Sequence, residues 1–321
     1  MKTLRPLLAL CLLISLVGQV SAQATLDRRL IQASELNTRG RSDEAIDLLR
    51  PLLEPQASFS NPADVGTAWN VLALAYQARG DYDAARRGYE KSLAILRQDA
   101  AMKLEFASAT DNLGSLYFEM HELGPSKTLR AKARQLYEEE GNHAGMARAS
   151  SGLALIALIQ EHRKEAHLNL DDAFCQIKLV SEPDRGDSAA LYSIRASLSG
   201  HDGDLHAALV AINRAIDLWM EETPASYMLP AGYSQRGQIQ DALGNHSDAM
   251  ADFQRALTLF KQNRDGDSQE YYLTEIAYAH AMSGAGSKNE AANVESEARA
   301  SLSRLEQHQC TNCMISVQSF Q

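Results

Sequence analysis

The chain has 321 residues, and 45 % of them are hydrophobic, which is enough apolar material for a folded core and excludes a disordered chain. With 31 Lys and Arg against 41 Asp and Glu, the formal net charge is −10, so the chain as a whole repels nucleic acid. It has no local basic stripe that would reverse this, and we expect no nucleic-acid partner. Only 19 Gly and 8 Pro are present, which excludes collagen-like and low-complexity chains.

The first 22 residues have the pattern of a signal peptide. The start is positive at Lys2 and Arg5, an apolar run follows from Leu7 to Val17, and small residues up to Ala22 suit a signal peptidase. The apolar run is short against the roughly 20 residues that cross a bilayer, which disfavours an uncleaved anchor. We therefore expect cleavage after Ala22, a periplasmic or secreted bacterial protein, and no membrane insertion after cleavage.

Two series of small residues recur along the rest of the chain. The first series has steps of 40, 41, 40, 42, 41 and 40 residues, and its members are Ala33, Ala73, Gly114, Ala154, Ala196, Gly237 and Ala277. The second series follows about 12 residues later, with steps of 40, 41, 40, 42, 41 and 42, and its members are Ala45, Ala85, Ser126, Ala166, Ala208, Ala249 and Ala291. Two phased series of this kind predict a protein of seven repeats.

Each repeat has the pattern of two helices joined by a tight turn. In residues 66–98, Trp69, Leu72 and Tyr76 fall on one face of a helix, Gly80 interrupts it, and a second apolar stripe follows. Small residues are expected where the two helices cross, because a larger side chain would force the axes apart. Glycines that permit a left-handed backbone are expected at the turns, and these are Gly40, Gly80, Gly203, Gly244 and Gly284.

The second repeat resembles the signature of the tetratricopeptide repeat family, in which a Trp, a Leu-Gly pair and a Tyr precede an Ala and an aromatic residue. The matching residues are Trp69, Leu72, Ala73, Tyr76, Gly80, Ala85 and Tyr89. The resemblance implies an all-α fold, a right-handed superhelical solenoid of about seven helix-turn-helix repeats over residues 23–305. The period of 40–42 residues exceeds the family's usual 34 and is similar to the elongated repeats of kinesin light chains.

No pattern in the chain supports catalysis, a cofactor or a bound metal. His162 and His167 are five residues apart, whereas a zinc pair on a helix needs three or four. The stretches 201–206 and 263–270 gather Asp, Gly and polar residues, but turns and linkers have that composition anyway. No Gly-rich phosphate loop or nucleophile elbow is present. We therefore expect a protein that is not an enzyme.

A Cys-x-x-Cys pair, Cys310 and Cys313, lies in a C-terminal tail over residues 306–321. In an oxidising compartment we expect a local disulfide there, with redox catalysis and zinc binding as less favoured alternatives. Cys175 lies in an apolar helical pattern and is expected to be a buried core thiol.

In the family resembled, the first helix of each repeat lines a concave groove that holds a peptide or a segment of a partner. The face of these helices that points away from the core predicts a polar and nearly uncharged groove. Its candidate residues are Asn37, Asn70, Gln77, Asp111, Phe118, Arg148, Gln238, Asp241, Tyr271 and Tyr278. A merely solvated face is the alternative.

The sequence therefore favours a non-enzymatic scaffold in the bacterial envelope that binds a protein or peptide segment in its groove. The alternative is a sensor or regulatory subunit whose superhelix responds to a small effector.

Overall fold

The structure is a computed structural model that describes residues 28–54, 62–221, 228–263 and 266–309. These residues form helices and short connections and contain no strand, which confirms the all-α prediction. Residues 1–22, predicted to be the signal peptide, and the tail cysteines Cys310 and Cys313 lie outside the described residues.

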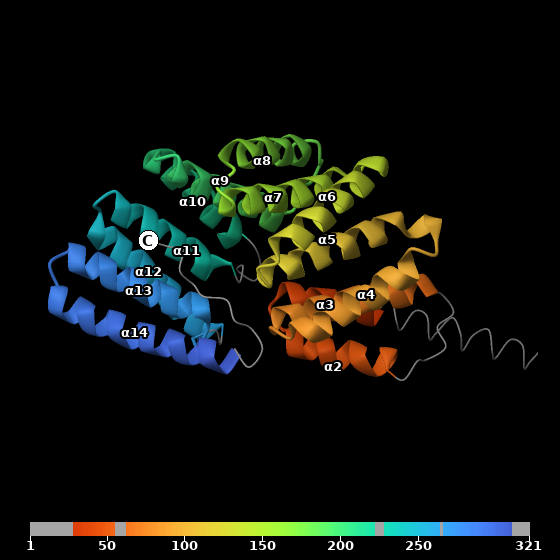
Figure 1. The fold of residues 1–321 in the computed structure, drawn as a ribbon, viewed down its shortest axis with the longest axis horizontal. Helices are drawn as coiled ribbons and strands as arrows, with labels where there is room; N and C mark the ends of the chain where they lie inside the picture. Colours follow the sequence, from red (N-terminus) through yellow and green to blue (C-terminus); the bar gives the residue numbers. More distant parts are fainter. Residues whose placement is uncertain (1–27, 55–61, 222–227, 264–265, 310–321) are drawn as a thin grey trace, which may run out of the picture. The chain divides into compact units, whose positions relative to one another are not determined.

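The described helices pair into seven hairpins, and the chain divides into two compact units, Met1–Pro183 and Asp184–Gln321 (Figure 1). The first unit pairs residues 28–38 with α2 (Ser42–Leu53), α3 (Pro62–Ala78) with α4 (Tyr82–Leu96), α5 (Lys103–Glu119) with α6 (Leu123–Glu139), and α7 (His143–Ile159) with α8 (Arg163–Ile177). The second unit pairs α9 (Arg185–His201) with α10 (Leu205–Met220), α11 (Leu229–Ala242) with α12 (His246–Gln262), and α13 (Gln269–Gly284) with α14 (Lys288–Gln309). A short 3₁₀ turn, Ala100–Met102, precedes α5.

The two helices of a hairpin pack closely at the predicted small residues. Ala45, Ala85 and Ala208 are fully buried, and so are their partners in the first series, such as Ala73. In the third hairpin the two series touch directly, because the Ser126 hydroxyl donates a hydrogen bond of 2.7 Å to the carbonyl of the other helix. These positions hold small residues because the neighbouring helix occupies the space that a larger side chain would need.

A residue in the left-handed region ends the first helix of every hairpin. The seven residues with positive φ at these turns are Gly40, Gly80, His121, Glu161, Gly203, Gly244 and Gly286. The last turn was placed two residues too early, at Gly284, because α13 continues to Gly284 itself and the left-handed residue is Gly286. His121 and Glu161 have φ of 60°, which carries a steric cost for any residue with a Cβ.

The last hairpin corrects the repeat register as well. Ala277 was predicted to be its first small residue, but Ala277 is half-buried, whereas Ala279 is 1 % exposed. With Ala279 and Gly286 in place, every hairpin has its turn residue seven positions after the first small residue and its second small residue twelve positions after it. The sequence pattern missed this because α13 has alanines at 277, 279 and 281.

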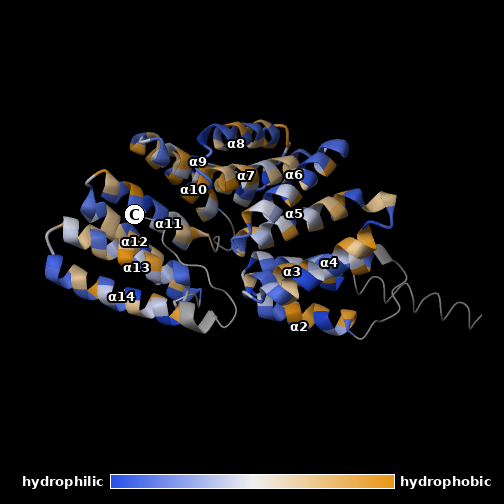
Figure 2. Cartoon of the chain, in the orientation of Figure 1, coloured by the Kyte–Doolittle hydropathy of each residue, from blue (hydrophilic) through white to orange (hydrophobic). Residues whose placement is uncertain are grey.

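The first helices of the hairpins form one layer within each unit, and the second helices form another. We call them inner and outer helices, because α3 contacts α5, α5 contacts α7, and α11 contacts α13 across the hairpins, whereas successive outer helices of the described chain make no comparable contact. Each helix is hydrophobic on part of its surface and hydrophilic on the rest (Figure 2).

Two further expectations differ from the structure. Cys175 is exposed on α8, because it lies on the side of the helix away from the buried Ala166, Leu170 and Ala173. The helix α14 continues to Gln309, past the boundary expected at residue 305.

Replacing Glu161 with glycine is expected to stabilise the first unit by about 1 kcal/mol, because glycine adopts a φ of 60° without the Cβ clash. Urea unfolding followed by circular dichroism measures the effect. Gly80→Ala is the reciprocal control and should destabilise the same unit by a similar amount. Equal stability of wild type and Glu161→Gly would show that the left-handed position carries no strain.

Replacing Ala85 with leucine is expected to destabilise the second hairpin by about 1–3 kcal/mol, because the fully buried alanine lies where α3 and α4 cross. Ala94→Leu adds the same side chain to an exposed position on α4 and should change the unfolding free energy by less than about 0.5 kcal/mol. Thermal unfolding of both variants compares them directly, and similar melting temperatures would contradict the role of the small residues.

Candidate functional site

All of the predicted groove residues lie on inner helices, but several of them are used to join one inner helix to the next. Asn37 donates to the carbonyl of Val71 over 2.9 Å, which joins the helix of residues 28–38 to α3. Asn112 of α5 donates to Asn70 of α3 over 3.0 Å. Asn70 is only 8 % exposed, so its side chain serves the contact between helices more than the surface.

Gln77 is the centre of a second junction between α3 and α5. Its amide nitrogen donates to Glu119 over 2.7 Å, and its oxygen accepts a hydrogen bond of 2.6 Å from Tyr89 of α4. Burial raises the pKa of the Tyr89 hydroxyl well above its usual value, and the charges of Glu119 and Asp111 raise it further. The hydroxyl therefore remains a donor at all physiological pH values, and three helices meet at one amide.

Asp111 of α5 interacts with arginines of α6 and α7. Its carboxylate pairs with the Arg130 guanidinium at 3.3 Å, and both side chains are nearly buried. Burial raises the pKa of Asp111, and the positive charges of Arg130 and Arg148 partly oppose this shift. A Cβ at Gly152 would overlap the guanidinium of Arg130, so α7 has a glycine where this arginine crosses it. Arg148 itself is exposed on the inner side of α7.

The second unit has equivalent junctions between its inner helices. Gln235 of α11 donates to the carbonyl of Ser193 on α9 over 3.0 Å, and the hydroxyls of Ser234 and Thr274 join α11 to α13 at 2.9 Å. Asp241 is predicted to line the groove, but its carboxylate oxygens lie 2.6 and 2.5 Å from the Nδ1 atoms of two histidines, His246 and His280.

Tyr271 and Tyr278 are not on the inner face. Tyr271 is 4 % exposed and packs edge-to-face on Phe260 of α12. Tyr278 is half-buried, and its hydroxyl accepts a hydrogen bond of 2.8 Å from Gln254 of α12. Both placements follow from the register of the last hairpin, since counting from Ala279 turns these side chains toward the outer helix.

The inner face instead presents one column of side chains, at the position directly after the first small residue of each inner helix. These residues are exposed or half-buried, and we call them the inner column: Ser34, Leu74, Ser115 and Leu155 in the first unit, and Ser197, Gln238 and His280 in the second. Gln238 was predicted, whereas Leu74, Leu155 and His280 were missed. The register of the small residues was the signal that could have found them. Phe118 is half-buried at the end of α5, beside this column.

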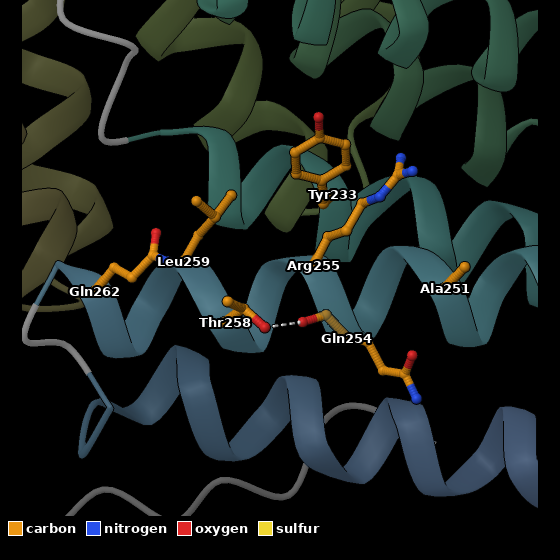
Figure 3. Close-up of a pocket in the computed structure, with 7 residues that line it drawn as sticks. All are labelled: Tyr233, Ala251, Gln254, Arg255, Thr258, Leu259 and Gln262. Atoms are coloured by element: carbon orange, nitrogen blue, oxygen red, sulfur yellow. Dashed lines mark hydrogen bonds between the residues drawn. The ribbon is translucent and has the colours of Figure 1, made fainter.

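Two adjoining hollows lie on the other side of the second unit, along the outer helix α12. The larger is about 510 Å³, and its lining residues are Tyr233, Ala251, Gln254, Arg255, Thr258, Leu259 and Gln262 (Figure 3). The smaller, about 230 Å³, has as its lining Asn213, Arg236, Gln240, Asp248, Ala251, Asp252 and Arg255. Sequence analysis pointed only to the inner helices and gave no indication of this outer groove.

The described residues offer no metal centre. No group of three or more His, Cys, Asp or Glu side chains in this part of the chain is arranged to hold an ion. Within the same residues, no helix has the length and hydrophobicity that a membrane span requires.

Comparisons with known proteins identify the repeats. Models of the tetratricopeptide repeat match residues 65–98, which contain α3 and α4, and residues 231–263, which contain α11 and α12. No curated protein matches the chain by sequence.

Three solved structures show the same fold at low sequence identity. BtubC (BKLC) from P. vanneervenii, a kinesin light chain-like protein, is 18 % identical, with a TM-score of 0.52 over 74 % of this chain and 92 % of that one. A Rap protein complexed with competence and sporulation factor is 11 % identical, with a TM-score of 0.59 over 89 % and 94 %. NprR in complex with its cognate peptide NprX is 10 % identical, with a TM-score of 0.65 over 91 % and 84 %.

The family models, the paired helices and these neighbours agree, and the chain is a tetratricopeptide repeat protein. Repeats of this family are generally non-catalytic scaffolds.

Asp172 provides a test of the polar contacts between helices. It accepts hydrogen bonds from Arg134 at 3.0 Å and Ser150 at 2.6 Å, which join α6, α7 and α8. Burial alone would raise the pKa of Asp172, but the hydrogen bonds from Arg134, Ser150 and Gln176 lower it below its usual value of 3.8.

Because the folded pKa of Asp172 is lowered, its carboxylate contributes stability above the usual pKa, and the contribution is lost as the pH falls through the folded value. Asp172→Asn is therefore expected to destabilise the protein by about 1 kcal/mol at pH 7 and to have little effect at about pH 2. Thermal unfolding between these pH values measures the difference. Asp47→Asn, at an exposed site on α2, is the control. A difference that persists at low pH would contradict the assignment.

Proposed function

We propose that this protein is a non-enzymatic scaffold that is exported to the bacterial envelope and binds a protein or peptide segment along the inner faces of its units. The observation that supports this is the inner column, a row of mostly small, polar and aliphatic side chains that are exposed or half-buried beside the polar groups that join the inner helices. Rap and NprR share the fold; Rap was solved in complex with competence and sporulation factor, and NprR with its cognate peptide.

The chemistry of this face suits an extended segment. Hydroxyl and amide side chains such as Ser115 and Gln238 can hydrogen-bond a backbone, while Leu74 and Leu155 offer apolar contacts between them. The spacing is regular because each hairpin contributes its residue at the same position. A segment crossing successive inner helices would meet one such side chain per repeat.

A regulatory role is the second candidate, and one further neighbour favours it. A signal transduction ATPase from Pyrococcus horikoshii, whose tetratricopeptide repeats are described as a sensor, is 10 % identical with a TM-score of 0.57 over 91 % of this chain and 48 % of that one. In this case a small effector would change the curvature of a unit, which small-angle scattering with and without envelope metabolites would detect.

A pull-down from bacterial envelope extract tests the scaffold proposal. In the second unit, Ala231, Gln238 and Ala242 are exposed on the inner side of α11, and changing all three to arginine should block this face without removing a contact between helices. We expect a protein that wild type enriches to be lost, or reduced at least about tenfold, with this variant.

The matched control places three arginines on α14, at the exposed positions Asn289, Asn293 and Ala300. It adds the same charge to an outer helix and should retain the partner. Circular dichroism confirms that both variants fold. Equal enrichment by wild type and the α11 variant would rule out the inner face of the second unit as the binding surface.

A further inference from the structure

The outer groove along α12 is a continuous surface. Its two hollows share Ala251 and Arg255, so together they follow α12 from Asp248 to Gln262. Tyr233 and Arg236 of α11 and Asn213 of α10 also line it. At 1.5 Å per helical residue, the groove is about 21 Å long, the length of about six extended residues.

Ala251 opens this groove. It lies two positions after the second small residue of its hairpin, and the equivalent residues of the other outer helices are all larger: Asp47, Arg87, Thr128, Leu168, Val210 and Asn293. A longer side chain at this position would lie across the junction of the two hollows. The alanine at this position is therefore specific to the sixth hairpin.

The charged side chains of the groove differ in how far a neighbouring opposite charge neutralises them. Arg236 donates two hydrogen bonds of 2.7 Å to Asp252 and a third of 2.9 Å to Asn213, so these two opposite charges neutralise each other. The Arg255 side chain is 63 % exposed, lies 4.0 Å from the Asp252 carboxylate and belongs to both hollows, and Asp248 lies at one end.

The other end of the groove is uncharged. Thr258, Leu259 and Gln262 surround it, and Tyr233 contributes its ring beside the Arg255 guanidinium at 5.8 Å. Figure 3 shows Tyr233 and Arg255 next to each other and pointing away from α13, while Gln254 points toward α13. The groove thus presents, in order along α12, a negative, a positive and an uncharged section.

We propose that this outer groove is a second binding surface, for an extended segment of a partner protein in which a basic residue precedes or follows an acidic residue by about three positions. The basic side chain pairs with Asp248, and the acidic side chain pairs with Arg255. Seven helical residues separate these two partners, about 10 Å along α12, which equals the length of about three extended residues. The uncharged section beyond Arg255 receives polar or aromatic side chains.

A library of random decapeptides displayed on phage and selected on the purified protein tests this surface. We expect enrichment of sequences with a basic and an acidic residue about three positions apart. A fluorescent synthetic copy of the enriched peptide then gives the dissociation constant by anisotropy. Failure to enrich any such pattern would overturn the proposal.

Ala251→Arg closes the groove at its centre, and Arg87 shows that the same position of α4 accepts this side chain. The variant should bind the peptide at least about tenfold more weakly. Thr128→Arg adds an arginine at the equivalent position of α6 and should bind as wild type does. Unchanged binding by Ala251→Arg would place the peptide elsewhere.

The double variant Asp248→Lys, Arg255→Glu exchanges the two charges without changing the total. Selection on this variant should recover peptides with the basic and acidic residues in exchanged order relative to the uncharged section, because each side chain still needs an opposite partner. Recovery of the original order would contradict the assignment of Asp248 and Arg255.

A second copy of this chain is a different occupant, and the experiments distinguish it. If wild type forms a dimer by analytical ultracentrifugation and Ala251→Arg does not, the groove is a self-association surface and the proposal is wrong. The α11 arginine variant that blocks the inner face should leave peptide binding to the outer groove unchanged. A negative result for binding at the inner face therefore does not count against binding at the outer groove, or the reverse.

Discussion

The close crossing of two helices within each hairpin is the constraint on which the rest of the structure depends. Where Ser126 of α6 donates to the carbonyl of Gly114 on α5, a Cβ at Gly114 would come within 3.0 Å of the Arg130 side chain, so the crossing leaves little room for a larger residue. The same crossing fixes how far each inner helix runs before its turn and which of its faces remains open. The inner column and the outer groove both follow from it, because each is defined by its distance along the chain from the crossing.

The repeat and the fold class could be predicted from sequence because they depend on residue size, which sequence shows directly. The last hairpin could not be placed correctly, since Ala277, Ala279 and Ala281 are alike in size and only packing decides which of them meets α14. The turns at His121 and Glu161 also escaped prediction, because a left-handed residue with a Cβ leaves no compositional signal.

The candidate site was harder to predict for a different reason. A polar residue on the inner side of a helix has the same sequence pattern whether it faces solvent or joins a neighbouring helix. Asn70 and Gln77 belong to the second group, since hydrogen bonds to the next inner helix use their amides. Substituting them would disturb the stacking of hairpins together with any binding, whereas Gln238 offers an exposed side chain on the same face. Burial, which sequence does not report, separates these two groups.

The two series of small residues and the turn residues between them allow side chains to be compared from one hairpin to the next. The turn lies seven residues after the first small residue in every hairpin, and the second small residue lies twelve after it, while the step from one hairpin to the next varies between 40 and 42. The variation in length therefore falls between the second small residue of one hairpin and the first small residue of the next, and the spacing across the crossing stays constant. Side chains at one offset occupy equivalent places in all seven hairpins, so the alanine at position 251 puts a smaller side chain at this place than any other outer helix has.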